Sequence, residues 1–168
     1  MNELAMAEMN QIETELIMLG TGNATVTKCY NTCFILQTKE TVLLVDGGGG
    51  NGILNQLEKV DVPIDSIHDM FVTHAHTDHI LGAVWMIRII AQRASNGHYF
   101  GTFRVYGHDK VLMVLEQICR MTLPVSVMKA INKHIEFYEI KNGDTLQLGD
   151  LSLQCFDIVS TKEKQYGF

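Results

Sequence analysis

The sequence predicts a layered α/β or α+β domain, on the basis of its length and the alternation of its apolar segments. The chain has 168 residues, of which 46% are hydrophobic and 19% charged, so it corresponds to one globular domain or a large part of one. Several short apolar runs come first, and strand-like and helix-like segments then alternate, as in layered folds. A chain of this length buries about 70% of its unfolded surface, so it needs no disulfide to hold a core.

Short apolar runs bounded by turn residues predict the strands. We expect them at 16–20, 32–38, 41–46, 67–73, 103–107, 134–140, 145–149 and 151–159. Lys39–Glu40, Asn142–Gly143 and Gly149–Asp150 are expected to be hairpin turns between consecutive strands. Residues 1–11, which are rich in Met and Glu, are expected to form a frayed or helical tail.

Apolar residues at helical spacing predict helices at 53–60, 78–93 and 111–121. The second helix is apolar on most sides, so we expect it to be internal, with Trp85 packed in the core. No repeat, linker or domain boundary interrupts the pattern.

Composition and charge exclude several classes of protein. Thirteen basic and nineteen acidic residues give a net charge of −6, so the chain lacks the general electrostatic footprint of a nucleic-acid binder. Its four scattered cysteines are expected to be buried thiols in a reducing compartment. The N-terminus lacks the positive region of a signal peptide, and the most apolar run, 80–91, contains Arg88 and is too short to span a membrane. We therefore expect a cytoplasmic protein.

One segment, Thr73-His-Ala-His-Thr-Asp-His79, carries the strongest chemical signal. An HxHxDH pattern should arise by chance in on the order of one in a thousand such chains. His74 and His76 project to the same side of an extended chain, and Asp78 and His79 follow on the turn into a helix. Imidazole and carboxylate ligands suit zinc or another first-row divalent ion such as Mn²⁺, and four ligands can serve two adjacent ions. The alternative is a histidine-rich turn hydrogen-bonded to backbone.

The sequence resembles the metallo-β-lactamase superfamily, and most closely its ribonuclease Z and phosphodiesterase branch, over nearly the whole chain. The resemblance is carried by LGTGNA (19–24), LLVDGGGG (43–50), FVTHAHTDHILG (71–82) and STKEKQYGF (160–168). It implies the αββα sandwich of that family, either complete or as the N-terminal αβ half plus extra strands. Residues 1–168 would then form a single metallo-β-lactamase-like domain, truncated at the C-terminal end.

The resemblance also implies roles for individual residues. His74 and His76 would bind one zinc ion, and Asp78 and His79 the second. Asp78 would in addition be the catalytic proton acceptor for the attacking water. Asp46, at the end of its strand, resembles a residue that orients one of the histidines, and its alternative role is a helix N-cap or turn aspartate.

The chain departs from the family pattern in two places. Val159 stands where ribonuclease Z-like relatives have a histidine ligand, so the first zinc would lose a ligand. The family's bridging aspartate and last histidine lie beyond residue 168. Among the remaining candidates, His68, His98, His108 and His134 are expected to be surface or locally bonded residues, and Lys162 and Lys164 could contact a phosphate backbone.

These observations support two classes of function. The first is a two-metal hydrolase of phosphodiesters, acting on RNA such as the 3′ trailer of a precursor tRNA, or on a small cyclic or aryl phosphodiester, ester or thioester. The second is an inactive half-domain that binds metal weakly and has a structural or partner-binding role.

The fold implied by the resemblance also predicts a homodimer. One face of the sheet, with Phe34, Leu36, Leu43, Val45 and Phe71, should be apolar and uncovered, and a second copy of the chain would bury it. In the competing arrangement, the three C-terminal strands fold over this face and leave a monomer.

Overall fold

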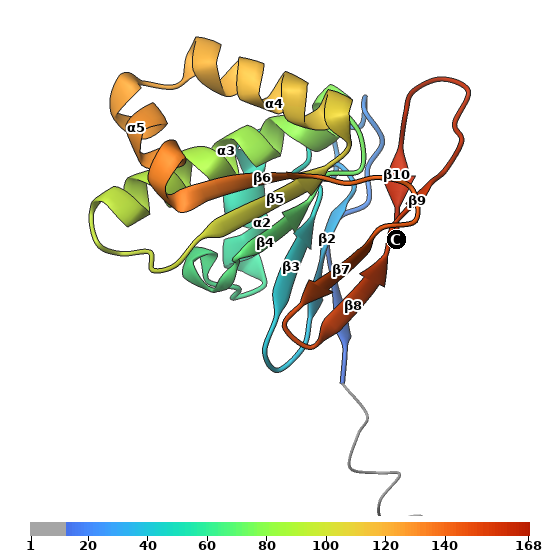
Figure 1. The fold of residues 1–168 in the computed structure, drawn as a ribbon, viewed down its shortest axis with the longest axis horizontal. Coiled ribbons are helices and arrows are strands. Elements are labelled where there is room, and N and C mark those ends of the chain that lie inside the picture. The colour runs from blue at the N-terminus through green and yellow to red at the C-terminus, as the bar shows by residue number, and fades with distance from the viewer. Residues whose placement is uncertain (1–12) are drawn as a thin grey trace, which may run out of the picture.

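A six-stranded mixed sheet forms the centre of the computed structural model, which describes residues 13–168 (Figure 1). The strands lie in the sheet in their order along the chain: β1 (Glu15–Gly20), β2 (Cys33–Gln37), β3 (Val42–Val45), β4 (Asp69–Phe71), β5 (Phe103–Gly107) and β6 (Ile135–Glu139). β1, β2 and β3 pair in antiparallel fashion, whereas β3 to β6 are parallel. Parallel neighbours need crossover connections, and helices supply them here.

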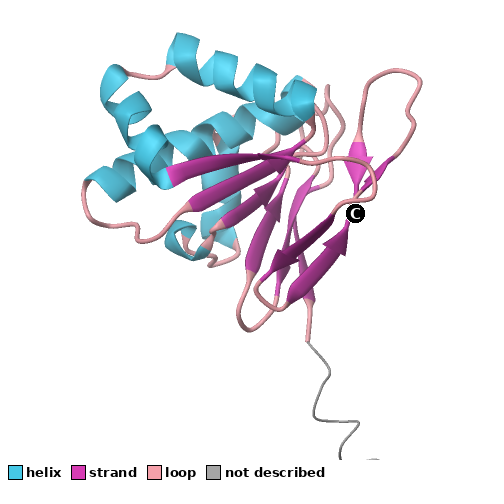
Figure 2. Ribbon diagram, viewed as in Figure 1, coloured by secondary structure: helices cyan, strands magenta, loops and turns pink. Residues whose placement is uncertain are grey.

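Helices cover one face of this sheet (Figure 2). They are α2 (Gly52–Lys59), α3 (Thr77–Ser95), α4 (Asp109–Thr122) and α5 (Val125–His134), and a short 3₁₀ turn, η2 (Ile64–Ser66), precedes β4. Side chains that alternate along the strands, such as Ile35, Leu44, Met70 and Val105, pack with these helices in the larger core. α3 is internal as expected, but Trp85 is 36% exposed, which corrects its predicted place in the core.

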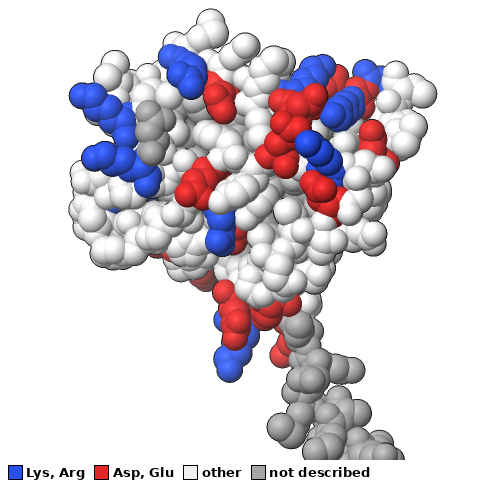
Figure 3. Space-filling view, in the orientation of Figure 1, with Lys and Arg blue, Asp and Glu red and all other residues white. Residues whose placement is uncertain are grey.

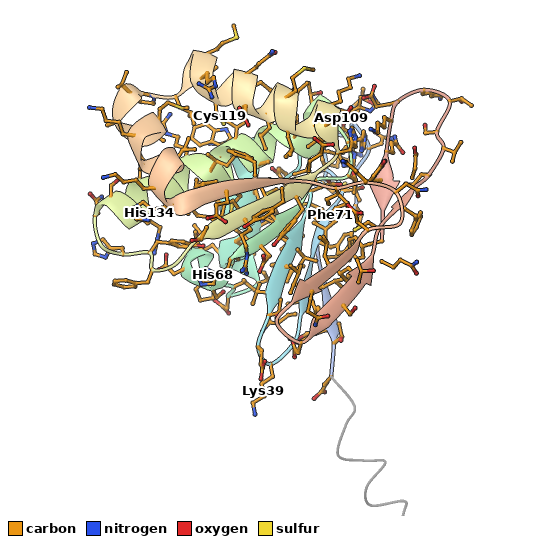
Figure 4. The ribbon with its side chains drawn as sticks, viewed as in Figure 1. Lys39, His68, Phe71, Asp109, Cys119 and His134 are labelled. Carbon is orange, nitrogen blue, oxygen red and sulfur yellow. The ribbon has the colours of Figure 1, made fainter. Side chains whose placement is uncertain are left out.

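Two small two-stranded sheets follow β6 in the chain. One consists of β7 (Thr145–Leu148) and β8 (Leu151–Gln154), and the other of β9 (Phe156–Asp157) and β10 (Tyr166–Gly167). Their apolar residues enclose Leu43, Val45 and Phe71, which are all buried, and Phe71 meets the ring of Phe168 at 5.0 Å (Figure 4). The prediction of an uncovered sheet face is therefore wrong, because the C-terminal segment buries these residues within one chain.

The predicted layered α/β class is confirmed, and the predicted strands and helices agree with the structure to within one or two residues at their ends, apart from β10 and the following differences. α5 was not predicted. Asn142–Gly143 is not a hairpin turn, because β6 and β7 belong to different sheets. The strand expected at 151–159 is divided into β8 and β9.

Three further expectations concern the cysteines, the tail and the membrane. Cys33, Cys119 and Cys155 are buried as expected, but Cys29 is exposed. The tail expected at 1–11 lies outside the described residues. Within residues 13–168, no helix has both the length and the apolar character needed to cross a bilayer.

Candidate metal centre

The HxHxDH residues lie at the edge of the sheet where the parallel strands end. Asp46 follows β3, His74 follows β4, and His108 follows β5. Because the carboxyl ends of parallel strands share one edge, residues far apart in the sequence meet there. The motif continues into the first turn of α3, which begins at Thr77.

Asp46 connects the motif to the sheet through three hydrogen bonds. Its carboxylate accepts from the backbone N–H of Thr73 (2.8 Å), from the Thr73 hydroxyl (2.8 Å) and from His79 Nδ1 (2.7 Å). The residue is 4% exposed and has a positive φ of 58°, a conformation that aspartate tolerates better than most residues. The N-cap of the next helix is Asn51, so the N-cap alternative for Asp46 does not apply.

The bond to Asp46 determines which nitrogen of His79 is available. A carboxylate accepts only, so Nδ1 carries a proton, and in the neutral ring it is Nε2 that keeps the lone pair. His79 Nε2 lies 3.5 Å from Asp78 Oδ2. Burial lowers the His79 pKa, but the hydrogen bond and charge of Asp46 and the charge of Asp78 outweigh it and raise the pKa above its ordinary value. This arrangement is typical of a metal-ligating histidine whose other nitrogen is anchored by a carboxylate.

His74 is oriented by the same network. The Thr73 hydroxyl has one proton, which it donates to Asp46, so His74 Nδ1 donates to Thr73 Oγ1 at 2.8 Å. Its Nε2 is therefore also unprotonated. Burial first, and then the neighbouring His79, lower the His74 pKa to about 4, so the ring is neutral at pH 7.

The structure brings the four motif side chains together. The His74 ring lies 4.0 Å from the His79 ring and 4.7 Å from the exposed His76 ring, measured between centroids. Within residues 13–168, however, no three His, Cys, Asp or Glu side chains are placed so that together they could hold a metal ion. The donor set nevertheless fits a first-row divalent ion by its chemistry, because imidazole nitrogens and a carboxylate are ligands that such ions prefer.

The glycine-rich loop after β3 packs directly against the start of α3. The Gly47 N–H donates to the His79 carbonyl (2.9 Å), and a Cβ on Gly82 would lie 1.7 Å from Gly47 O, so only glycine fits there. The Tyr30 hydroxyl, which has one proton to donate, lies within hydrogen-bonding distance of two carbonyls of the loop, Gly47 O (2.9 Å) and Gly50 O (2.7 Å). Sequence reasoning did not find Tyr30, because it lies in a loop without any motif of its own.

The C-terminal segment returns to the motif without supplying a histidine. The Tyr166 N–H donates to Thr73 O (3.0 Å), while Val159 is 80% exposed with a positive φ of 58°. Two ion pairs join this segment to the start of α4: Lys164 with Asp109 (2.6 Å) and Lys110 with Glu163 (2.8 Å). Figure 4 shows Asp109 at this junction.

Of the two places expected for His108, at the surface or bonded locally, the structure excludes the surface and shows a local contact with Asp109. His108 is fully buried beside Tyr166, with ring centroids 5.3 Å apart, and its Nδ1 lies 3.4 Å from Asp109 Oδ1. Its Nε2 has no hydrogen-bond partner in the described part of the chain. His68 is bonded locally as expected, to the hydroxyl of Tyr99 at 2.9 Å.

Comparison with known proteins identifies a family and a fold. The family model described as "Anti-Pycsar protein Apyc1" matches residues 14–168. The anti-Pycsar protein Apyc1 of Bacillus phage BSP38 is 37% identical over 70 residues, covering 41% of this chain and 27% of that protein. Ribonuclease Z of Crocosphaera subtropica is 27% identical over 157 residues, covering 92% of this chain and 46% of that protein. The chain thus spans between about a quarter and about half of these two relatives.

Solved structures show the same fold. Human tRNase Z, short form, superposes with a TM-score of 0.70 at 16% identity, covering 92% of this chain and 62% of that one. The metallo-β-lactamase fold protein YhfI from Bacillus subtilis gives 0.68 at 19% identity, covering 91% and 56%. The metallo-β-lactamase fold expected from the motif is therefore confirmed, as is the resemblance to ribonuclease Z.

Proposed function

Because the chain belongs to the Apyc1 family of anti-Pycsar proteins, within the ribonuclease Z-like part of the metallo-β-lactamase superfamily, we propose that it is a metal-dependent phosphodiester hydrolase. One observation carries the proposal. In the neutral rings, the Asp46–Thr73 network holds the proton of both His74 and His79 on Nδ1, so Nε2 is the nitrogen available to a metal, and Nε2 of His79 lies 3.5 Å from Asp78 Oδ2. In the alternative, a histidine-rich turn bonded to backbone, nothing would require both rings to be oriented through Nδ1.

Each residue has a distinct part in the proposed reaction. His74 and His76 would hold one divalent ion, zinc or Mn²⁺, and Asp78 and His79 a second. Bound ions lower the pKa of water toward 7 and stabilise charge on phosphodiester oxygens. The Asp78 carboxylate would accept the proton of the attacking water. Asp46 would keep His79 in the tautomer that binds metal.

RNA is the first candidate substrate, as the names of the ribonuclease Z relatives suggest, and a small cyclic or aryl phosphodiester is the second. The ion pairs near the motif favour the small substrate. Lys110 at the start of α4 and Lys164 of the C-terminal segment are paired with Glu163 and Asp109, respectively. Figure 3 shows blue and red side chains side by side at the upper right, over this junction. Phosphate contacts dominate RNA affinity, and paired lysines supply fewer of them.

A cytoplasmic location and a homodimer remain part of the proposal. Since the C-terminal strands cover the sheet face, a dimer would have to use other apolar surface, such as the exposed Met113, Met121 and Val125. Light scattering at micromolar concentration tests it, and a stable monomeric mass would exclude the dimer.

Hydrolysis of bis-p-nitrophenyl phosphate tests the main proposal. We expect the chain to release nitrophenol when zinc or manganese is added, and the His76→Ala variant to lose this activity. Mass spectrometry of the metal content separates failure to bind from failure to react. A chain that binds metal through the motif but releases no nitrophenol would support the inactive, partner-binding alternative.

A further inference from the structure

The glycine-rich loop, residues 47–52, encloses the side chain of Tyr30. A Cβ on Gly48 would lie 2.3 Å from Tyr30 Cε1, and a Cβ on Gly52 would lie 2.6 Å from Tyr30 Cε2. Carbon atoms at these distances would clash, so glycine at both positions allows the loop to pass along the two edges of the ring. The loop therefore wraps around a tyrosine that comes from the distant connection between β1 and β2.

The Tyr30 hydroxyl is the polar contact at the centre of this loop. It lies 2.9 Å from Gly47 O and 2.7 Å from Gly50 O, so two carbonyls converge on one donor. Burial raises the pKa of Tyr30 to about 12, so the hydroxyl keeps its proton at neutral pH. A phenyl ring in the same place would leave both carbonyl oxygens facing carbon, and the loop would have to move to find other donors.

The loop contacts the metal motif mainly through His79. The Gly47 N–H donates to the His79 backbone carbonyl at 2.9 Å, and Asp46, the residue before Gly47, accepts from His79 Nδ1 at 2.7 Å. Three residues further along α3, the Gly82 N–H donates to Gly48 O at 2.9 Å. Because Asp46, Gly47 and Gly48 are consecutive, a displacement of Gly47 would change all three contacts.

The other oriented histidine depends less on the loop. His74 Nδ1 donates to Thr73 Oγ1, and only the Thr73 side chain then contacts Asp46. The loop thus reaches the His74 ring through two residues, whereas it contacts both the backbone and the ring of His79 directly. A change in the loop should therefore alter the position of His79 first.

We propose that Tyr30 is a positioning residue for the metal centre, because its hydroxyl fixes the glycine-rich loop in the place from which Asp46 and Gly47 hold His79. The inference rests on the proposed function, to which it adds a residue outside the motif. Tyr30 is not a metal ligand in this proposal, and it acts only through the loop.

Zinc titration of Tyr30→Phe at pH 7 tests the proposal. This substitution removes the hydroxyl and keeps the ring between Gly48 and Gly52. Loss of a residue that directly anchors a metal-ligating histidine lowers metal affinity by about 10- to 100-fold, and Tyr30 acts one residue further away, so we expect a loss of about 3- to 10-fold.

Tyr99→Phe is the matched control. The Tyr99 hydroxyl also lies between two partners, Ile67 O and His68 Nδ1, each at 2.9 Å, but it is next to the start of β4 and away from the loop. Both substitutions remove one hydroxyl from a tyrosine that donates to a backbone carbonyl. We expect both to lower the urea unfolding midpoint, and only Tyr30→Phe to lower the zinc affinity.

Nitrogen-edited NMR of the metal-free chain provides a readout that a loss of stability alone would not change. The proton that His79 Nδ1 donates to the buried Asp46 carboxylate should give a signal of its own, and His79→Gln identifies it. We expect Tyr30→Phe to shift or broaden this signal in the folded chain, and Tyr99→Phe to leave it unchanged.

The results that would overturn the proposal are distinct from those that would refute the proposed function. Unchanged zinc affinity in Tyr30→Phe, an unchanged His79 signal in that variant, or an equal loss of zinc affinity in Tyr99→Phe would each show that Tyr30 does not position His79 for a metal. A chain that binds no zinc would refute the proposed function. The His79 signal of the metal-free chain would then decide by itself whether Tyr30 positions this residue.

Discussion

Replacing Asp46 with asparagine tests the network that orients the motif. Asparagine has nearly the same size and tolerates the positive φ of 58° at this position, so the backbone need not change. The variant keeps one acceptor oxygen for the Thr73 N–H but presents an NH₂ group where Oδ2 accepts from Thr73 Oγ1 and His79 Nδ1. His79 can then accept at Nδ1 only by moving its proton to Nε2, the nitrogen proposed to bind metal.

The burial of Asp46 and its hydrogen bonds determine how much Asp46→Asn should lower the free energy of unfolding and the metal affinity. Hydrogen bonds to a charged group contribute about 1.5–3 kcal/mol, and a buried donor left without an acceptor costs about 1–3 kcal/mol. Asp46 is 4% exposed, so solvent does not replace the lost partner, and we expect the free energy of unfolding to fall by about 2–4 kcal/mol. Loss of a carboxylate that anchors a metal-ligating histidine lowers metal affinity by about 10- to 100-fold.

Urea unfolding and zinc titration at pH 7 measure these two quantities. Asp65→Asn is the matched control, because Asp65 also accepts two short hydrogen bonds, from Arg93 at 2.7 and 2.8 Å, but its side chain is 38% exposed. This exposed pair should contribute less than about 1 kcal/mol and leave zinc affinity unchanged. If Asp46→Asn binds zinc as tightly as the original chain, the proposed orienting role of Asp46 is wrong.

Three further predictions follow from single positions. Val159→His should raise the zinc affinity measured by titration. It should not destabilise the fold, because histidine tolerates the positive φ of 58° at this position better than valine does. An unchanged zinc affinity would mean that position 159 is not a ligand position. The free energy of unfolding of the metal-free chain should fall by up to about 3 kcal/mol as the pH falls from about 6.5 toward 4. In this pH range His74 binds a proton in the unfolded chain but not in the folded chain, where its pKa is lowered to about 4. The difference between the urea unfolding midpoints at pH 4.5 and at pH 7 should therefore be smaller in the His74→Gln variant than in the original chain. Gly82→Ala should abolish soluble protein or lower its Tm sharply, since the new Cβ would lie 1.7 Å from Gly47 O, whereas Gly97→Ala, with open space around it, should cost only about 1 kcal/mol from its positive φ.

The sequence was most informative where structure depends on neighbouring residues. The motif lies at one junction between a strand and a helix, so its spacing already indicated which side chains meet. The order of strands and helices was likewise visible from local periodicity. α5 was missed because only Leu123 and Pro124 separate it from α4, although proline before an apolar pattern is itself a helix-start signal.

Contacts between distant segments could not be predicted in the same way. The periodicity of β7 and β8 shows that each has an apolar side, but it does not say which face of the sheet they cover. Tyr30 reaches the glycine-rich loop across 17 to 20 residues, and His108 is buried by Tyr166 from the end of the chain. Burial of such residues depends on tertiary packing, which overrides their average preference for the surface.

The C-terminal segment packs against the rest of the fold although it supplies no metal ligand at position 159. Tyr166 still bonds to Thr73, and two ion pairs still join the segment to α4, although Val159 can offer no electron pair to a metal. Residues 163–166 are therefore docked by contacts that do not depend on a metal ligand at position 159. Because Asp46 supports His79 directly and His74 only through Thr73, the proposed ion at Asp78 and His79 has the better anchored protein ligands. The proposed ion at His74 and His76 is the one that a histidine at position 159 would complete.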